Sequence, residues 1–169
     1  MSSGRIKLQI QERLTSILQE ITLANGFATD TKGSYRGRAT FGAETDLPFT
    51  SVLESPRSGF NISATEDRTV SKDEWTLLIQ GFSKANGQEH PTDAAYLFLD
   101  DVERQLGKIA AAKTNGMGGG IYPEYYMLGG LISGIELDPA VVRPGSDDVS
   151  PMAYFYQPVR ITITRDLKC

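Results

Sequence analysis

The sequence offers few side chains of the kinds that carry covalent or metal chemistry. It has one histidine, His90, and one cysteine, Cys169. A zinc site of nitrogen and sulfur ligands needs more such residues than the chain holds, and a serine or cysteine nucleophile would need His90 as its base. His90 precedes Pro91 at the start of a predicted helix, a position typical of a turn or a cap. We therefore expect no catalytic residue, no metal site and no cofactor.

Carboxylates gather at two places. Asp100, Asp101 and Glu103 fall in one predicted helix, where they flank its apolar stripe and are expected to form its solvated face. Asp147 and Asp148 lie between proline and glycine residues, which is typical of a loop. Neither group has the spacing of a calcium-binding loop. One alternative to a protein without catalysis is a small enzyme that uses carboxylates such as Asp100 and Asp101. A polar pocket in which carboxylates with perturbed pKa values converge would favour this alternative.

The run Gly-Met-Gly-Gly-Gly at residues 116–120 invites comparison with phosphate-binding loops. A dinucleotide fingerprint that begins at Gly116 needs its third glycine where the chain has Ile121. The chain also lacks the Gly-Lys-Ser/Thr of a phosphate loop, and no strand, turn and helix are predicted around the run. It is therefore predicted to be a flexible loop.

Two stretches combine residue types that are favoured at protein interfaces. Residues 35–38, Tyr-Arg-Gly-Arg, join aromatic and guanidinium groups, and residues 121–128 are unusually apolar and aromatic for a segment without a clean period. The candidate interface residues are Tyr35, Arg36, Arg38, Tyr122, Tyr125, Tyr126 and Met127. The alternatives are a solvated loop for the first stretch and a cover over one end of the sheet for the second.

Two amphipathic helices are predicted to build the scaffold. Their apolar stripes are Ile10, Leu14, Ile17, Leu18 and Ile21 in the first, and Ala95, Leu99, Val102, Leu106 and Ile109 in the second. Asn25 and Gly26 supply a left-handed stop after the first helix, and Thr92 is the predicted N-cap of the second.

Four strands are predicted, around residues 46–54, 74–81, 131–137 and 155–164. Trp75, Leu77 and Ile79 share one face of the second strand, whose mixed other face predicts a central place in the sheet. The fourth strand alternates most clearly, although Pro158 within it indicates an edge or a bulge. A further short strand is predicted at residues 38–41.

The order of these elements predicts one α+β domain over residues 1–169, with a mainly antiparallel sheet of about four strands packed by two helices. Long loops are expected near residues 28–46, 55–73 and 115–127. The net charge of −4 argues against tight non-specific binding of nucleic acid or an anionic membrane. The sequence shows neither a signal peptide nor a membrane span, so we expect a soluble chain of the intracellular type.

The same patterning resembles the tail terminator proteins of long-tailed bacteriophages and, more loosely, their neck and tail-completion relatives. The resemblance extends over residues 6–167 and is carried by element order and patterning rather than by an invariant motif. Its parts are the first helix, Asp-Leu-Pro-Phe at 46–49, Glu-Trp-Thr-Leu-Leu-Ile-Gln-Gly at 74–81, the helix at 94–103 and the strand at 159–163.

The resemblance implies a structural virion protein without catalytic residues. Such a subunit assembles as a hexameric ring on the end of the tail tube, stops tube polymerisation and offers a surface to the head-side neck or connector protein. The genomic DNA passes through the ring without specific binding. The implied location is the virion, after synthesis in the host cytoplasm. A neck or head–tail joining subunit is the alternative from the same virion, and it implies a similar ring.

Overall fold

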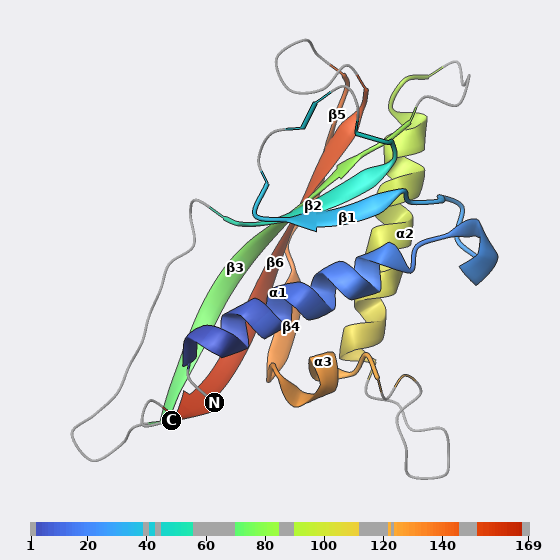
Figure 1. Cartoon of the computed structure of the whole chain (residues 1–169). Coiled ribbons are helices and arrows are strands. Elements are labelled where there is room, and N and C mark those ends of the chain that lie inside the picture. The colour runs from blue at the N-terminus through green and yellow to red at the C-terminus, as the bar shows by residue number, and fades with distance from the viewer. Residues whose placement is uncertain are drawn as a thin grey trace.

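The computed structural model describes residues 3–38, 41–42, 45–55, 70–84, 90–111, 122, 124–145 and 152–166. The elements are α1 (Ser3–Gln19), a short 3-10 helix η1 (Leu23–Asn25), β1 (Gly33–Arg36), β2 (Phe49–Glu54), β3 (Val70–Phe82), α2 (Asp93–Ala110), α3 (Met127–Gly130), β4 (Gly134–Leu137), β5 (Val141–Arg143) and β6 (Tyr154–Asp166). The chain therefore has the α+β composition that the sequence predicts. Figure 1 shows β3 and β6 as the two long strands, with α1 and α2 packed beside them.

The described strands form one sheet of six strands rather than about four. Their order is β1-β2-β3-β6-β4, and β5 also pairs with β6. The pair β1 and β2 is parallel, whereas the other pairs are antiparallel, so the sheet is mixed although mainly antiparallel. The short strand predicted at residues 38–41 lies instead at Gly33–Arg36, and β5 was not predicted. Strands of four and three residues are too short to show a period, and neighbours distant in sequence hold them in place.

β6 is a central strand, so Pro158 marks neither an edge nor a bulge. β3 pairs with one side of β6, while β5 and β4 pair with successive parts of its other side. Pro158 falls where the partner changes from β5 to β4, and its carbonyl accepts the N–H of Asp138 from the connection between them (3.1 Å). In a strand, the N–H and the carbonyl of one residue point to the same side. The N–H that Pro158 lacks would therefore point toward the connection between β5 and β4, where no ladder hydrogen bond is lost.

The main core lies between the two long helices and one face of the sheet. Every residue of the two predicted helical stripes is buried, and so are Trp75, Leu77 and Ile79 of β3. The alternate residues Phe155, Val159, Ile161 and Ile163 supply the facing part of β6. β3 occupies the centre of the sheet, as its sequence predicts. Gly26 is left-handed (φ 85°), but it closes η1, since α1 has already ended at Gln19.

A second, smaller cluster lies on the opposite face of the sheet. Its buried members are Phe49, Phe82 and Tyr154, and partly buried Tyr35, Phe41, Leu47 and Tyr156 pack against them. The side chains at these strand positions point away from the helices, because strand residues alternate between the two faces. The cluster thus covers one end of a sheet face on which no described helix packs.

Several predicted features lie outside the described residues. These are the glycine run at 116–120, Asp147, Asp148 and Cys169, together with parts of the three predicted loops at 28–46, 55–73 and 115–127. Within the described part of the chain, no helix has the length and apolar character needed to cross a bilayer.

Candidate interaction surfaces and cavity

Tyr35, Arg36 and Arg38 lie at one edge of the sheet and form what we call the β1 rim. Tyr35 and Arg36 belong to β1, the outermost strand next to β2. Arg36 pairs at 3.7 Å with Glu12 of α1, and both side chains are about half exposed. The guanidinium of Arg38 lies over the rings of Tyr35 and Phe41, at 5.1 and 4.7 Å from their centroids. The rim therefore presents Arg38 on an aromatic support, while Arg36 is held by its ion pair with Glu12 of α1.

The second predicted contact segment is held by the helices. Tyr125 donates a hydrogen bond to Glu20, near the end of α1. This hydrogen bond, helped by partial burial, raises the pKa of Tyr125 to about 12. Arg13 of α1 donates to the carbonyl of Glu124 at 2.8 Å. These two hydrogen bonds hold the segment against α1.

The aromatic residues of this segment divide between inner and outer positions. The amine of Lys108 lies 5.4 Å from the rings of Tyr122 and Tyr125, which lie edge to face. Met127 packs partly against the main core, whereas Tyr122 and Tyr126 remain 37% and 41% exposed. Only Tyr122 and Tyr126 therefore offer substantial aromatic surface to a partner.

The backbone of α3 is left-handed. Met127, Leu128, Gly129 and Gly130 have φ values of 48°, 53°, 71° and 91°. Positive φ is unfavourable for residues with a Cβ atom, by about 1–2 kcal/mol each. Leu128 is almost fully buried in the core, and this burial holds the turn in place. The strained turn therefore fixes where Tyr126 emerges from the surface.

The two predicted surfaces reach α1 at adjacent residues. Glu12 pairs with Arg36 of the β1 rim, and Arg13 binds the backbone of Glu124. A shallow depression lies between them, lined by Gln9, Glu12, Arg13, Ser16 and Leu131. The structure therefore brings the two sets of predicted residues to the two sides of one exposed helix face, although they do not touch one another.

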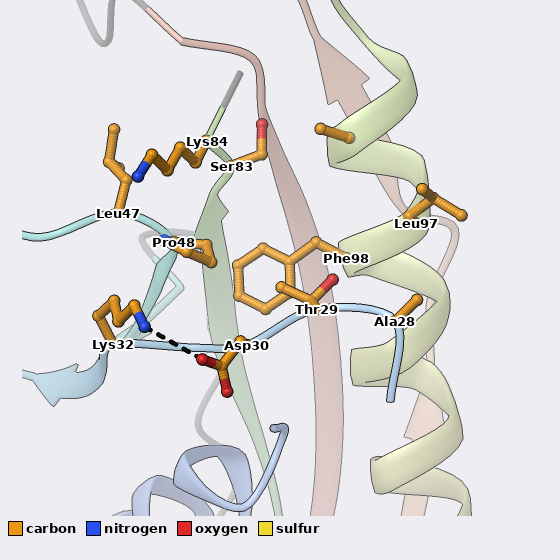
Figure 2. A pocket seen from close by; sticks show the side chains of 11 residues that line it. Ala28, Thr29, Asp30, Lys32, Leu47, Pro48, Ser83, Lys84, Leu97 and Phe98 are labelled. Carbon is orange, nitrogen blue, oxygen red and sulfur yellow. Dashed lines mark hydrogen bonds and ion pairs between the residues drawn. The ribbon is translucent and has the colours of Figure 1, made fainter. Parts of the chain in front are cut away.

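A small open cavity lies at the start of α2. It is lined by residues from four segments, namely 28–32, 47–48, 83–84 and 94–98, and holds about 230 Å³. Figure 2 shows the ring of Phe98 reaching from α2 toward Pro48, with Lys84 and the ion pair of Lys32 and Asp30 nearby. The amine of Lys32 lies 3.0 Å from the Asp30 carboxylate and, together with the N–H of Leu23, lowers the pKa of Asp30.

The chemistry of the cavity lining suits binding better than catalysis. Its volume lies below the roughly 300–1,000 Å³ of most small-molecule sites. Asp30 is engaged by Lys32, and the hydroxyl of Ser83 donates to the carbonyl of Ala153 at 2.6 Å. Asp30 and Ser83 are therefore engaged within the protein, and the space matches a side-chain-sized group.

The carboxylates of α2 do not converge on a pocket. Asp101 is buried rather than solvated as predicted, because its carboxylate accepts the N–H of Thr29 at 2.8 Å and ties the preceding loop to the helix. Asp100 is exposed on the outer side of the helix. Glu103 is partly buried, and this burial, with the nearby Asp100 charge, raises the pKa of Glu103. The convergent arrangement that a carboxylate enzyme requires is not formed by these residues.

Sequence reasoning missed an apolar patch on the outer side of α2. Tyr96 and Leu97 are 58% and 45% exposed, although the other large apolar side chains of the helix face the core. The signal was present in the sequence, since both residues fall outside the stripe that begins at Ala95. Tyr96 and Leu97 thus form a short second apolar stretch on α2, in addition to the apolar stripe that packs against the core.

The remaining polar candidates form no site. Among the residues that the structure describes, no three histidine, cysteine or acidic side chains lie together as metal ligands. His90 is an exposed turn residue whose carbonyl accepts the N–H of Asp93 at 3.2 Å. Thr92 occupies the predicted N-cap position, but its side chain makes no capping hydrogen bond.

No protein-family model matches this chain, and neither does any curated protein sequence.

Proposed function

We propose that this chain is a structural subunit of the bacteriophage tail, and that it acts as a tail terminator without catalysis. It would assemble as a hexameric ring on the end of the tail tube, end tube polymerisation and receive the head-side neck or connector protein. The genomic DNA would pass through the ring without specific binding. The virion is accordingly the proposed location of the protein.

The observation that carries this proposal is the order and patterning of the elements. An amphipathic helix precedes three strands, a second amphipathic helix follows, and three further strands complete the sheet. Both helices cover one face of the sheet, and no described helix covers the other face. The segments that carry the resemblance to tail terminators lie in or beside α1, β2, β3, α2 and β6.

The described surface also supports an assembly role. A ring of identical subunits needs two different patches on each copy that fit one another with a rotation that closes. The chain carries separate patches of interface-type residues, namely the β1 rim, the exposed Tyr122 and Tyr126, and the outer side of α2. Tyrosine and arginine are enriched at protein interfaces, and such patches are unnecessary for an isolated monomer.

Binding to tail-tube ends tests the proposal. Purified protein is mixed with purified tail tubes of a phage that encodes it, and the tubes are imaged by negative stain. We expect density at one end of each tube and a halt in further growth when free tube protein is added. A ring that ignores tube ends and instead binds the isolated head-side connector would replace the terminator proposal with the neck alternative.

A further inference from the structure

The outer side of α2 presents a stripe of mixed chemistry, which we call the α2 stripe. It consists of Asp93, Tyr96, Leu97, Asp100 and Glu103. These residues follow the spacing of one helix face, because positions three and four apart are neighbours on a helix. Exposed tyrosine is favoured at protein interfaces, and the carboxylates beside Tyr96 and Leu97 give this surface a negative charge that a cationic partner would match.

The carboxylates of the α2 stripe lack an ion-pair partner in the part of the chain that the structure describes. Within the described residues, Asp93, Asp100 and Glu103 form no ion pair, whereas Asp30, Glu12, Glu136 and Asp138 each pair with a lysine or an arginine. Partial burial raises the pKa of Glu103, and repulsion from the nearby Asp100 charge adds to this rise. A cation from another molecule would relieve this repulsion.

The β1 rim offers complementary chemistry. Arg38 has no carboxylate partner within the described residues, and its guanidinium is held by aromatic stacking instead. Arg36 shares its charge with Glu12 across 3.7 Å, and its side chain remains 42% exposed. Arginine held on an aromatic support is already ordered, so less side-chain entropy is lost when it binds a carboxylate or a tyrosine ring.

The two patches belong to different parts of the subunit. α2 packs on β3, β6 and β4, whereas β1 is the outermost strand at the other end of the sheet and is covered by α1. Two copies can therefore meet head to tail, with the stripe of one against the rim of the other. The pair then keeps one free stripe, on one copy, and one free rim, on the other, for further neighbours, as a ring requires.

We infer that the α2 stripe of one copy docks on the β1 rim of the next copy, with its carboxylates facing Arg36 and Arg38 and with Tyr96 and Leu97 in the contact. The occupant of the stripe is thus a second copy of this chain. The inference rests on the proposed ring and adds the two surfaces that close it.

Reversing the charges of each patch tests this inference. One variant carries Asp100→Lys with Glu103→Lys, and another carries Arg36→Glu with Arg38→Glu. Each alone places like charges at the contact and should weaken self-association, measured by sedimentation velocity, by about tenfold or more. Mixing the two variants, or combining all four substitutions in one chain, should restore association because every contact is again between opposite charges.

Two controls separate docking from folding and from net charge. Circular dichroism should show that each variant keeps the wild-type helix content and melting behaviour. The pair Asp46→Lys and Glu74→Lys changes the net charge by the same amount as the reversed stripe, at exposed positions outside both patches and outside the segment of Tyr122 and Tyr126. This control pair should associate like the wild-type chain.

The inference is overturned if either reversed variant associates normally, or if mixing the variants fails to restore association. A wild-type chain that stays monomeric at every concentration also overturns it, although binding of that monomer to tube ends would leave the proposed function standing. Rings that depend on both patches but ignore tube ends would support the docking and contradict the tail role. Rings that survive reversal of the stripe but lose tube-end binding would assign the stripe to the tube protein.

Discussion

At the scale of single residues, the sheet depends on one position where a side chain is absent. Gly81 of β3 lies opposite Phe155 of β6, and the Phe155 ring occupies the space of the missing side chain. The ring is fully buried and meets Phe98 of α2 edge to face, with 5.5 Å between centroids. The glycine thus lets an aromatic side chain join the sheet to the helix.

Gly81→Ala should therefore destabilise the protein. A Cβ atom at this position would lie 2.1 Å from a carbon of the Phe155 ring, which has no free space to move into. We expect a loss of about 1–3 kcal/mol in unfolding free energy, measured by urea denaturation. The matched control is Gly107→Ala on the exposed side of α2, where no atom lies within 4 Å. This change should stabilise the helix by about 0.5–1 kcal/mol, and equal effects of the two substitutions would contradict the packing described.

Asp101 and Asp100 are neighbours with opposite roles, which gives a second residue-scale prediction. Asp101→Ala leaves the N–H of Thr29 without its partner and should lower the unfolding free energy by about 1–3 kcal/mol. Asp100→Ala removes an exposed carboxylate and should change it by less than about 0.5 kcal/mol. Thermal melts of the two single variants test this contrast, and equal losses would mean that Asp101 does not hold the loop.

At the scale of elements, β6 organises the fold by presenting two different faces. Ile161 faces the helices and is fully buried, whereas Thr164 lies on the other face and is exposed. β3, β4 and β5 all pair with β6, so damage to its inner face removes support from much of the sheet.

Ile161→Asp should therefore unfold the protein or nearly so. A carboxylate at this position is buried without a partner, and we expect a loss of more than about 4 kcal/mol. Thr164→Asp places the same charge on the exposed face of the same strand and should stay within about 0.5 kcal/mol of wild type. Circular dichroism melts compare the two variants. A normally melting Ile161→Asp chain would mean that the core face has been misplaced.

A substitution in the left-handed turn α3 should destabilise the protein even where it removes no contact. Gly129 has a φ of 71°, and a Cβ atom there would meet no atom within 4 Å. Gly129→Ala should still lower the unfolding free energy by about 1 kcal/mol, because the alanine must adopt a left-handed conformation. Chemical denaturation measures this loss. If Gly129→Ala were neutral, the chain would have to adopt another backbone conformation at this turn.

The sequence predicts the long elements of this fold and the short strand β4, but it misses β1, β5 and α3, for a physical reason. Helical stripes such as Ile10 to Ile21 repeat a period several times, and so does the alternation in β6. β1, β5 and α3 span three or four residues each, so their conformations are fixed by distant partners rather than by local pattern. Leu128 illustrates this, since its burial stabilises a backbone conformation that leucine itself disfavours.

The candidate surfaces were predicted in part. The aromatic and arginine content at Tyr35 and Arg38 indicated a contact surface, but their place at a sheet edge depends on pairing with β2, which is distant in sequence. The cavity at the start of α2 could not be foreseen, because its lining comes from four separate segments. The α2 stripe was accessible to sequence reasoning, since Tyr96 and Leu97 fall outside the apolar stripe of their helix.

At the scale of the whole molecule, the residues that stabilise the core are separate from those of the two proposed contact patches. The core between the helices and one sheet face holds the subunit together, while the β1 rim and the α2 stripe stay outside it. Substitutions at these two patches should therefore change assembly and leave the melting temperature almost unchanged. Substitutions such as Ile161→Asp should abolish both, because an unfolded subunit cannot assemble.

The molar mass of the purified wild-type chain tests the central claim of ring assembly most directly. It is measured by light scattering, alone and after mixing with purified tail tubes, and the same fractions are imaged by negative stain. If the chain is a tail terminator, we expect closed rings of about six copies, either free or bound to tube ends. A single-copy mass at every concentration, with no protein at tube ends after mixing, would contradict it.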